Sequence, residues 1–107
     1  MIKEFSDEYE FLSSLYECEI RYSGKTFKNV EAAYQYSKCA IYEDKEIFPE
    51  LSGQEALNVG KHVKVRQDWD NVKYKIKYNL NKHKFLFHPE LKEKLLNTGD
   101  EELLNGF

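Results

Sequence analysis

Cysteine is scarce in this chain of 107 residues, and long apolar runs are missing. The two cysteines, Cys18 and Cys39, lack the close spacing of a zinc or redox motif and are too few for a disulfide scaffold. No segment approaches the roughly 20 apolar residues that cross a bilayer, and acidic residues near the start replace the apolar run of a signal peptide. These absences predict a cytoplasmic protein with reduced thiols and no membrane contact.

An excess of positive charge is also missing, because the formal net charge is -3. Bulk electrostatics therefore does not favour non-specific nucleic-acid binding, and any phosphate site must be local. The three histidines, His62, His83 and His88, share no metal-binding spacing, and the chain has neither a glycine-rich phosphate loop nor a nucleophile elbow. We accordingly expect no metal ion, no other cofactor and no covalent serine chemistry.

The residues that are present are typical of one globular domain. A charged fraction of 33% beside a hydrophobic fraction of 41% describes a soluble protein, and the length supports a single domain over residues 1–107. The aromatic content of 15% suits either a dense core or a base-stacking pocket, and composition does not choose between them.

Local patterns predict a mostly helical α+β domain with a short N-terminal β-hairpin. Alternation on both sides of a Ser-Gly turn predicts the hairpin, and Asn29 and Ser52 are suited to cap two helices. Apolar residues from Trp69 to Phe87 recur at spacings of three and four, as in a long amphipathic helix. The predicted elements are a hairpin over 17–28, helices over 30–42, 52–60, 68–87 and 89–96, an extended segment over 61–66, and a helix stop at Thr98-Gly99-Asp100.

The predicted helix over 30–42 carries a polar row beside its apolar stripe. The residues aligned in this row at helical spacing are Glu31, Gln35, Lys38 and Tyr42. In the first turn the helix N-terminus would keep Glu31 ionised, which suits a base or a cation stabiliser better than a proton donor. Lys38 would anchor a phosphate or hold Glu31 through an ion pair. The alternative is a solvated helix face with a favourable first-turn acid.

Basic and aromatic residues follow in the second half of the chain. In an extended segment His62, Lys64 and Arg66 would face one way and form either a phosphate grip or the protected edge of a sheet. Trp69 either stacks on a planar base or begins the apolar stripe of the long helix, and the residues alone favour the second role.

Several motifs occur in the order found in one known family. They are Glu8-Tyr9-Glu10-Phe11-Leu12-Ser13, Tyr22-Ser23-Gly24-Lys25-Thr26-Phe27, Val30-Glu31-Ala32-Ala33-Tyr34-Gln35 with Lys38, Ala56 with Gly60, Arg66-Gln67-Asp68-Trp69-Asp70, Lys84-Phe85 and Leu95-Leu96-Asn97-Thr98-Gly99-Asp100. Through this succession the chain resembles the NADAR family, also called YbiA-like, over nearly its whole length. The resemblance implies a small, mostly helical α+β fold and N-glycosidase activity on a ribosyl phosphate or an ADP-ribose conjugate, free or attached to nucleic acid.

The resemblance also implies roles for individual residues. Glu31 matches the family's helix glutamate, and it would stabilise positive charge on the ribose or orient the attacking water. The tryptophan of the Arg-x-Asp-Trp segment would stack on the substrate, and two basic residues would bind its phosphate. The implied substrate-binding residues are Lys38, Arg66, Trp69, Gln35, Ser13 and Ser14.

Two departures from the family pattern affect the implied site. Leu12-Ser13-Ser14-Leu15-Tyr16 stands where the family usually has Leu-Ser-Asn-Phe-Tyr, so an amide and an aromatic ring are absent from this loop. Leu103-Leu104-Asn105 replaces the usual Leu-Val-Glu, and we expect a C-terminally shortened domain without the family's Trp-Gly segment and its aspartate. The loss of that acid would reduce the rate by roughly the 10²–10⁴-fold that general acid–base catalysis supplies. The alternatives are a non-catalytic ADP-ribose or nucleotide-binding module and a structural interaction fragment.

Overall fold

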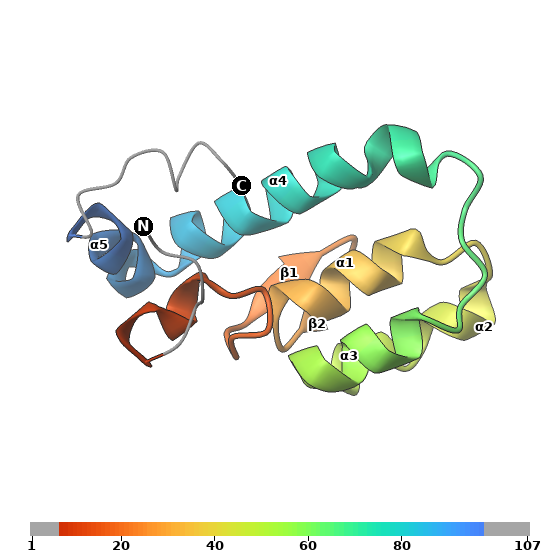
Figure 1. Ribbon diagram of the computed structural model, residues 1–107, viewed down its shortest axis with the longest axis horizontal. Coiled ribbons are helices and arrows are strands. Elements are labelled where there is room, and N and C mark those ends of the chain that lie inside the picture. The colour runs from red at the N-terminus through yellow and green to blue at the C-terminus, as the bar shows by residue number, and fades with distance from the viewer. Residues whose placement is uncertain (1–6, 98–107) are drawn as a thin grey trace.

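The computed structural model describes residues 7–97 and places one helix, α1, at the centre of the fold. Its elements are η1 (Asp7–Leu12), β1 (Ile20–Tyr22), β2 (Lys25–Phe27), α1 (Val30–Lys38), α2 (Tyr42–Lys45), η2 (Phe48–Glu50), α3 (Gly53–Gly60), α4 (Trp69–Phe87) and α5 (Pro89–Asn97), where η denotes a 3-10 helix. Figure 1 shows α1 between α4 on one side and α3 on the other, and α1 packs against both. The predicted mostly helical α+β fold is confirmed.

The two strands form the predicted hairpin. They pair antiparallel with Ile20 opposite Phe27, and both of these side chains are fully buried. Ser23 and Gly24 both have positive φ angles, 53° and 77°, which match the right-handed twist of a tight two-residue turn. The hairpin packs on α1. The turn predicted from the sequence therefore positions two strands that form one side of the core.

Helix α1 begins where the sequence predicts. The Asn29 side chain accepts a hydrogen bond from the Ala32 N–H at 2.7 Å and donates to the Leu51 carbonyl at 3.2 Å. Asn29 is itself fully buried, so its amide caps the helix and ties it to the segment before α3. Because α1 lies between two helices and the hairpin, most of its side chains are buried, including polar ones.

The end of α1 differs from the prediction, because the helix stops at Lys38 rather than at residue 42. Cys39 turns to extended backbone and forms an isolated antiparallel bridge with Val65. The Ala40 N–H donates to the Lys64 carbonyl at 2.8 Å, and the Arg66 N–H donates to the Lys38 carbonyl at 3.0 Å. This distant pairing takes the backbone groups that another helical turn would have used.

Two consequences follow for the predicted elements around this bridge. Tyr42 belongs to the separate short helix α2 and is 61% exposed, so it is not part of the polar row. The extended segment predicted over 61–66 is wrong for residues 61–63, which form a turn and a bend. Among the described residues, pairing of this segment is confined to the bridge at Val65 and the flanking backbone hydrogen bonds of Lys64 and Arg66, and the side chains of His62 and Lys64 are exposed.

The remaining helices follow the sequence closely. Ser52 and Glu55 form the predicted capping box at the start of α3. Helix α4 ends at Phe87, and Pro89 begins α5, as predicted. The predicted stop at Thr98-Gly99-Asp100 and the Leu103-Leu104-Asn105 motif lie outside the described residues. No helix within residues 7–97 is long and apolar enough to span a membrane.

The core has two parts that lie along α4. The larger part surrounds α1 and includes residues of the hairpin, η2 and α3. The smaller part joins η1 to the end of α4 and to α5, and consists of Phe11, Leu12, Phe85, Leu91 and Leu95. Phe87, expected on the apolar stripe of α4, is 67% exposed, whereas Lys84 is fully buried.

Candidate functional site

Glu31 lies in the first turn of α1 and is buried, with 7% of its surface exposed. Its backbone N–H donates to the Ser14 carbonyl at 2.9 Å, which joins the helix start to the loop after η1. The side chain therefore does not belong to a solvated helix face, which was the alternative left open by the sequence. A buried carboxylate is costly without compensating partners.

The surroundings of Glu31 combine desolvation with positive charge. Burial raises the pKa of the Glu31 carboxyl above its ordinary value, and this effect is the largest. The ammonium groups of Lys77 and Lys38 oppose it, and so does a hydrogen bond from the Gln35 amide. The carboxylate thus has a raised proton affinity next to two cations, an arrangement suited to proton transfer.

Two buried acceptor atoms in this region are unsatisfied. Within residues 7–97, Glu31 Oε2 and Gln35 Oε1 have no hydrogen-bond partner. Gln35 lies one helical turn after Glu31 on α1 and is 5% exposed. An unsatisfied buried polar group costs about 1–3 kcal/mol, so such atoms are uncommon in a folded core. Both atoms accept hydrogen bonds, and the groups that would satisfy them are hydroxyls, N–H groups or water.

The end of α3 fixes the neighbouring side chains of α1. A Cβ atom at Gly60 would overlap the side-chain amide of Gln35, so glycine is needed for this close approach. The Lys38 ammonium donates to the Gly60 carbonyl at 2.7 Å. The positive charge of Lys38 therefore lowers the pKa of Glu31, while one N–H of its ammonium already donates to the backbone of α3.

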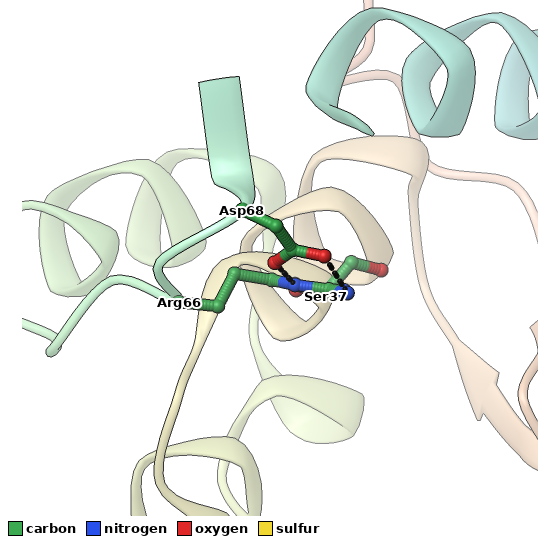
Figure 2. A network of polar contacts seen from close by, with 3 residues as sticks. All are labelled: Ser37, Arg66 and Asp68. Atoms are coloured by element: carbon green, nitrogen blue, oxygen red, sulfur yellow. Dashed lines mark hydrogen bonds and ion pairs between the residues drawn. The ribbon is translucent and has the colours of Figure 1, made fainter. Parts of the chain in front are cut away.

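Arg66 lies at the other end of α1. Figure 2 shows its guanidinium facing the Asp68 carboxylate, with Nε and Nη2 donating to the two oxygens at 2.5 Å and 2.8 Å. A third donor reaches the Ser37 carbonyl at 3.4 Å. Arg66 thus joins the start of α4 to the last turn of α1, and its bidentate partner is an acid of the same chain.

Trp69 packs against Tyr34. The two ring centroids are 5.0 Å apart with an interplanar angle of 55°, and Trp69 is 9% exposed. Lys77 Nζ lies 5.2 Å from the centroid of the Tyr34 ring. Burial raises the pKa of the Tyr34 hydroxyl, and the nearby Glu31 charge adds to this effect. Tyr34 and Trp69 therefore form an aromatic wall between α1 and α4, with Glu31 and Lys77 close to Tyr34.

The loop with Ser13 and Ser14 is held from two sides. The Ser13 hydroxyl accepts a hydrogen bond from the Leu15 N–H at 3.0 Å, and the Ser13 carbonyl accepts one from the Lys84 ammonium at 2.9 Å. Lys84 is fully buried, and burial lowers its pKa to about 8. The predicted loop therefore contacts Glu31 through the Ser14 carbonyl and Lys84 through the Ser13 carbonyl.

Sequence reasoning gave no site role to Lys77, and it named Lys84 only as part of the Lys84-Phe85 motif. Their spacing contains a usable signal, because Lys77 follows Trp69 by eight residues and Lys84 follows Lys77 by seven. Such intervals keep residues on one side of a helix. Among the described residues no group of three or more His, Cys, Asp or Glu side chains could hold a metal ion.

This geometry defines a class of small α+β domains in which a buried glutamate at the start of the central helix faces lysines of that helix and of the following long helix. Residues 2–106 match the NADAR domain, and the chain belongs to the NADAR domain family. The resemblance read from the ordered motifs is thereby confirmed.

Two relatives illustrate this membership. The chain is 37% identical over 83 residues to the N-glycosidase Npun_R5314 of Nostoc punctiforme, an alignment that covers 72% of this chain and 53% of that protein. The NMR structure of the E. coli protein YbiA is similar with a TM-score of 0.79 and 27% identity, covering 91% of this chain and 60% of that chain. The chain thus spans about half the length of the curated relative.

Proposed function

We propose that this protein is an N-glycosidase that hydrolyses the bond between ribose and a nitrogenous base or amine. The observation that carries the proposal is the buried Glu31 carboxylate, whose Oε2 lacks a partner within residues 7–97 beside the equally unsatisfied Gln35 Oε1. Ribose hydroxyls and water supply the donors that these two acceptors need. The name of the Nostoc punctiforme relative, an N-glycosidase, supports the same reaction class.

Glu31 has two tasks in this reaction. Cleavage of the C–N bond builds positive charge on the ribose, and an ionised carboxylate in a desolvated site stabilises that charge. The water that forms the new C–O bond gives a proton to Glu31, while the electron pair of the broken C–N bond stays on the leaving nitrogen. Glu31 then returns the proton to that nitrogen. The raised pKa of its carboxyl favours the first of these transfers, the uptake of the proton from water.

We further propose that the substrate is a phosphorylated riboside or an ADP-ribose conjugate, free or attached to nucleic acid, and that the reaction occurs in the cytoplasm. Gln35 and the Ser13-Ser14 loop would contact the ribose beside Glu31. Trp69 would support the planar part of the ligand together with Tyr34. The basic residues assigned to the phosphate from the sequence, Lys38 and Arg66, would have to share their present partners with it.

The proposal is tested by incubating the protein with NAD, ADP-ribose, ADP-ribosylated DNA and a ribosylaminopyrimidine phosphate, followed by product analysis. Release of a base or amine from any of them is the expected result. Glu31→Gln should lower the rate of this release by about 10²–10⁴-fold, and Glu43→Gln, which changes an exposed glutamate of α2, should leave it unchanged. If no product forms, or if both variants keep full activity, the assignment is wrong.

One observation favours a second candidate, a module that binds ADP-ribose without turnover. Glu31 is the only buried acidic side chain among residues 10–97. A single acid can bind ribose hydroxyls, whereas general acid and base roles are often divided between two groups. Calorimetry with ADP-ribose separates the candidates, because heat of binding without product release supports the module and excludes the hydrolase.

A further inference from the structure

The cations on and beside α1 and α4 differ in how much of their hydrogen-bonding capacity is already used. The Lys38 ammonium donates to a backbone carbonyl of α3, and the Arg66 guanidinium grips Asp68. Lys73 pairs with Asp70 at 3.2 Å. In the described part of the chain Lys77 has neither a hydrogen bond nor an ion pair from its ammonium, although it contributes the largest favourable charge at Glu31.

The position of Lys77 is fixed by the packing of α4 on α1. The two helices run side by side in Figure 1, and Lys77 lies half-buried on the face of α4 toward Tyr34. Its ammonium is 5.2 Å from the Tyr34 ring centroid. This cation–π contact uses the ring face for one side of the ammonium and leaves other N–H donors available.

We propose that Lys77 is the specificity-determining residue that binds the phosphate of the substrate and so selects anionic ribosides over neutral nucleosides. The inference rests on the proposed ribose site, where the unsatisfied Glu31 Oε2 would accept a hydrogen bond from a sugar hydroxyl. Tyr34 of the same helix lies near the Glu31 charge and holds the Lys77 ammonium against its ring. A phosphate carried by that sugar would meet repulsion from the Glu31 carboxylate and from a protein of net charge -3. Lys77 supplies the positive charge that offsets this repulsion.

Lys77 suits this task better than the two cations expected from the sequence. A phosphate at Lys38 or Arg66 would have to compete with a carbonyl or a carboxylate that is already in place. At Lys77 it would only share the ammonium with the face of Tyr34. The compact charge and three donors of an ammonium fit a phosphate oxygen without demanding a fixed plane.

The experiment measures binding rather than turnover. ADP-ribose, ribose 5-phosphate and adenosine are titrated calorimetrically into wild type, Lys77→Met, Lys77→Arg and Lys75→Met, the last changing an exposed lysine of the same helix. We expect Lys77→Met to bind ADP-ribose and ribose 5-phosphate about 10- to 100-fold more weakly, the loss of one charge-assisted contact. Adenosine should bind wild type and Lys77→Met equally, whether weakly or not at all.

The other variants make the result decisive. Lys77→Arg keeps a cation at the site and should stay within a few-fold of wild type, while Lys75→Met should change neither ligand. An equal weakening of adenosine, a matching loss in Lys75→Met, or a wild type that binds neither phosphorylated ligand would overturn the proposal. Phosphate-dependent binding without product release would remove the hydrolase and leave the role of Lys77 supported.

Discussion

Glu31 and Lys84 are both buried charges that touch the same loop, and they differ in how they are satisfied. Lys84, in the smaller part of the core, donates to the Ser13 carbonyl and lies beside the rings of Tyr16 and Phe85. The Glu31 backbone N–H donates to the Ser14 carbonyl, but within residues 7–97 the side-chain Oε2 of Glu31 has no partner. Burial and a shifted pKa are common to both residues, so the unsatisfied acceptor is what distinguishes the candidate site from a structural group.

The largest effect is expected for a substitution of Glu31, which tests whether the unsatisfied acceptor marks a catalytic group. Glu31→Gln keeps the shape of the side chain, removes its charge and should lower the rate of base release by about 10²–10⁴-fold. The free energy of unfolding should not fall, because a buried charge without a full set of partners is replaced by a neutral amide. Product analysis and urea denaturation measure the two quantities, and a loss of stability that parallels the loss of rate would contradict the assignment.

A somewhat smaller effect is expected at Gly60, which positions Gln35 beside Glu31. Alanine there would place a Cβ atom where the Gln35 amide lies, so the amide must move. A displacement of about 1 Å near a reacting group costs on the order of 100-fold in rate, and we expect about 10- to 100-fold. Stability should change by less than about 1 kcal/mol, because the higher helix propensity of alanine compensates for the crowding.

Asn58→Ala, at an exposed position of the same helix, is the matched control for Gly60→Ala. Product analysis and thermal unfolding of both variants give the readout. If the two variants retain equal activity, the amide of Gln35 has no part in the site.

The third prediction tests whether Lys84, the satisfied buried charge, contributes to stability without taking part in the reaction. Lys84→Met keeps most of the apolar stem but leaves the buried Ser13 carbonyl without its donor, and loss of a hydrogen bond to a charged group costs about 1.5–3 kcal/mol. Urea denaturation should therefore detect a clear loss, whereas Lys82→Met, at an exposed site one turn away, should not. Residual activity per folded molecule should remain, since Lys84 holds the loop without facing the substrate.

The last prediction concerns the pH dependence of stability. The pKa of Lys84 is lowered to about 8 in the folded protein and returns to its ordinary value near 10.5 on unfolding. Between these values the unfolded chain binds more protons, so the free energy of unfolding rises with pH, by at most about 1.4 kcal/mol per pH unit. Below about pH 8 Lys84 is charged in both the folded and the unfolded state, so the full cost of burying the ammonium lowers the free energy of unfolding. The difference between wild type and Lys84→Met, measured by denaturation from pH 7 to 10, should show this slope, and a flat difference would contradict it.

Much of the fold could be predicted from the sequence because its signals are local. Asn29 and Ser52 cap their helices through neighbouring backbone groups, and the hairpin depends on the two residues of its turn. The end of α1 could not be predicted, because Cys39 leaves the helix to pair with Val65 across a long stretch of chain. No local pattern contains that information.

The residues of the candidate site likewise fall into those that could be predicted from local sequence and those that could not. Glu31 and Gln35 were found because they lie one turn apart on one helix, and the structure brings them together in a buried position. Lys77 and Lys84 were missed because their burial depends on which face of α4 meets α1 and η1, a tertiary fact. The partner of Lys38, a carbonyl of α3, was missed for the same reason.

The bridge between Cys39 and Val65 has a practical consequence for engineering. It closes residues 40–64 into a loop whose ends are fixed, and the entropy cost of such a loop grows only with the logarithm of its length. Helix α2 (Tyr42–Lys45) lies inside this loop and has no buried residues. An inserted peptide or fluorescent tag at α2 should therefore be tolerated, and it would provide a reporter that leaves the contact between α1 and α4 intact.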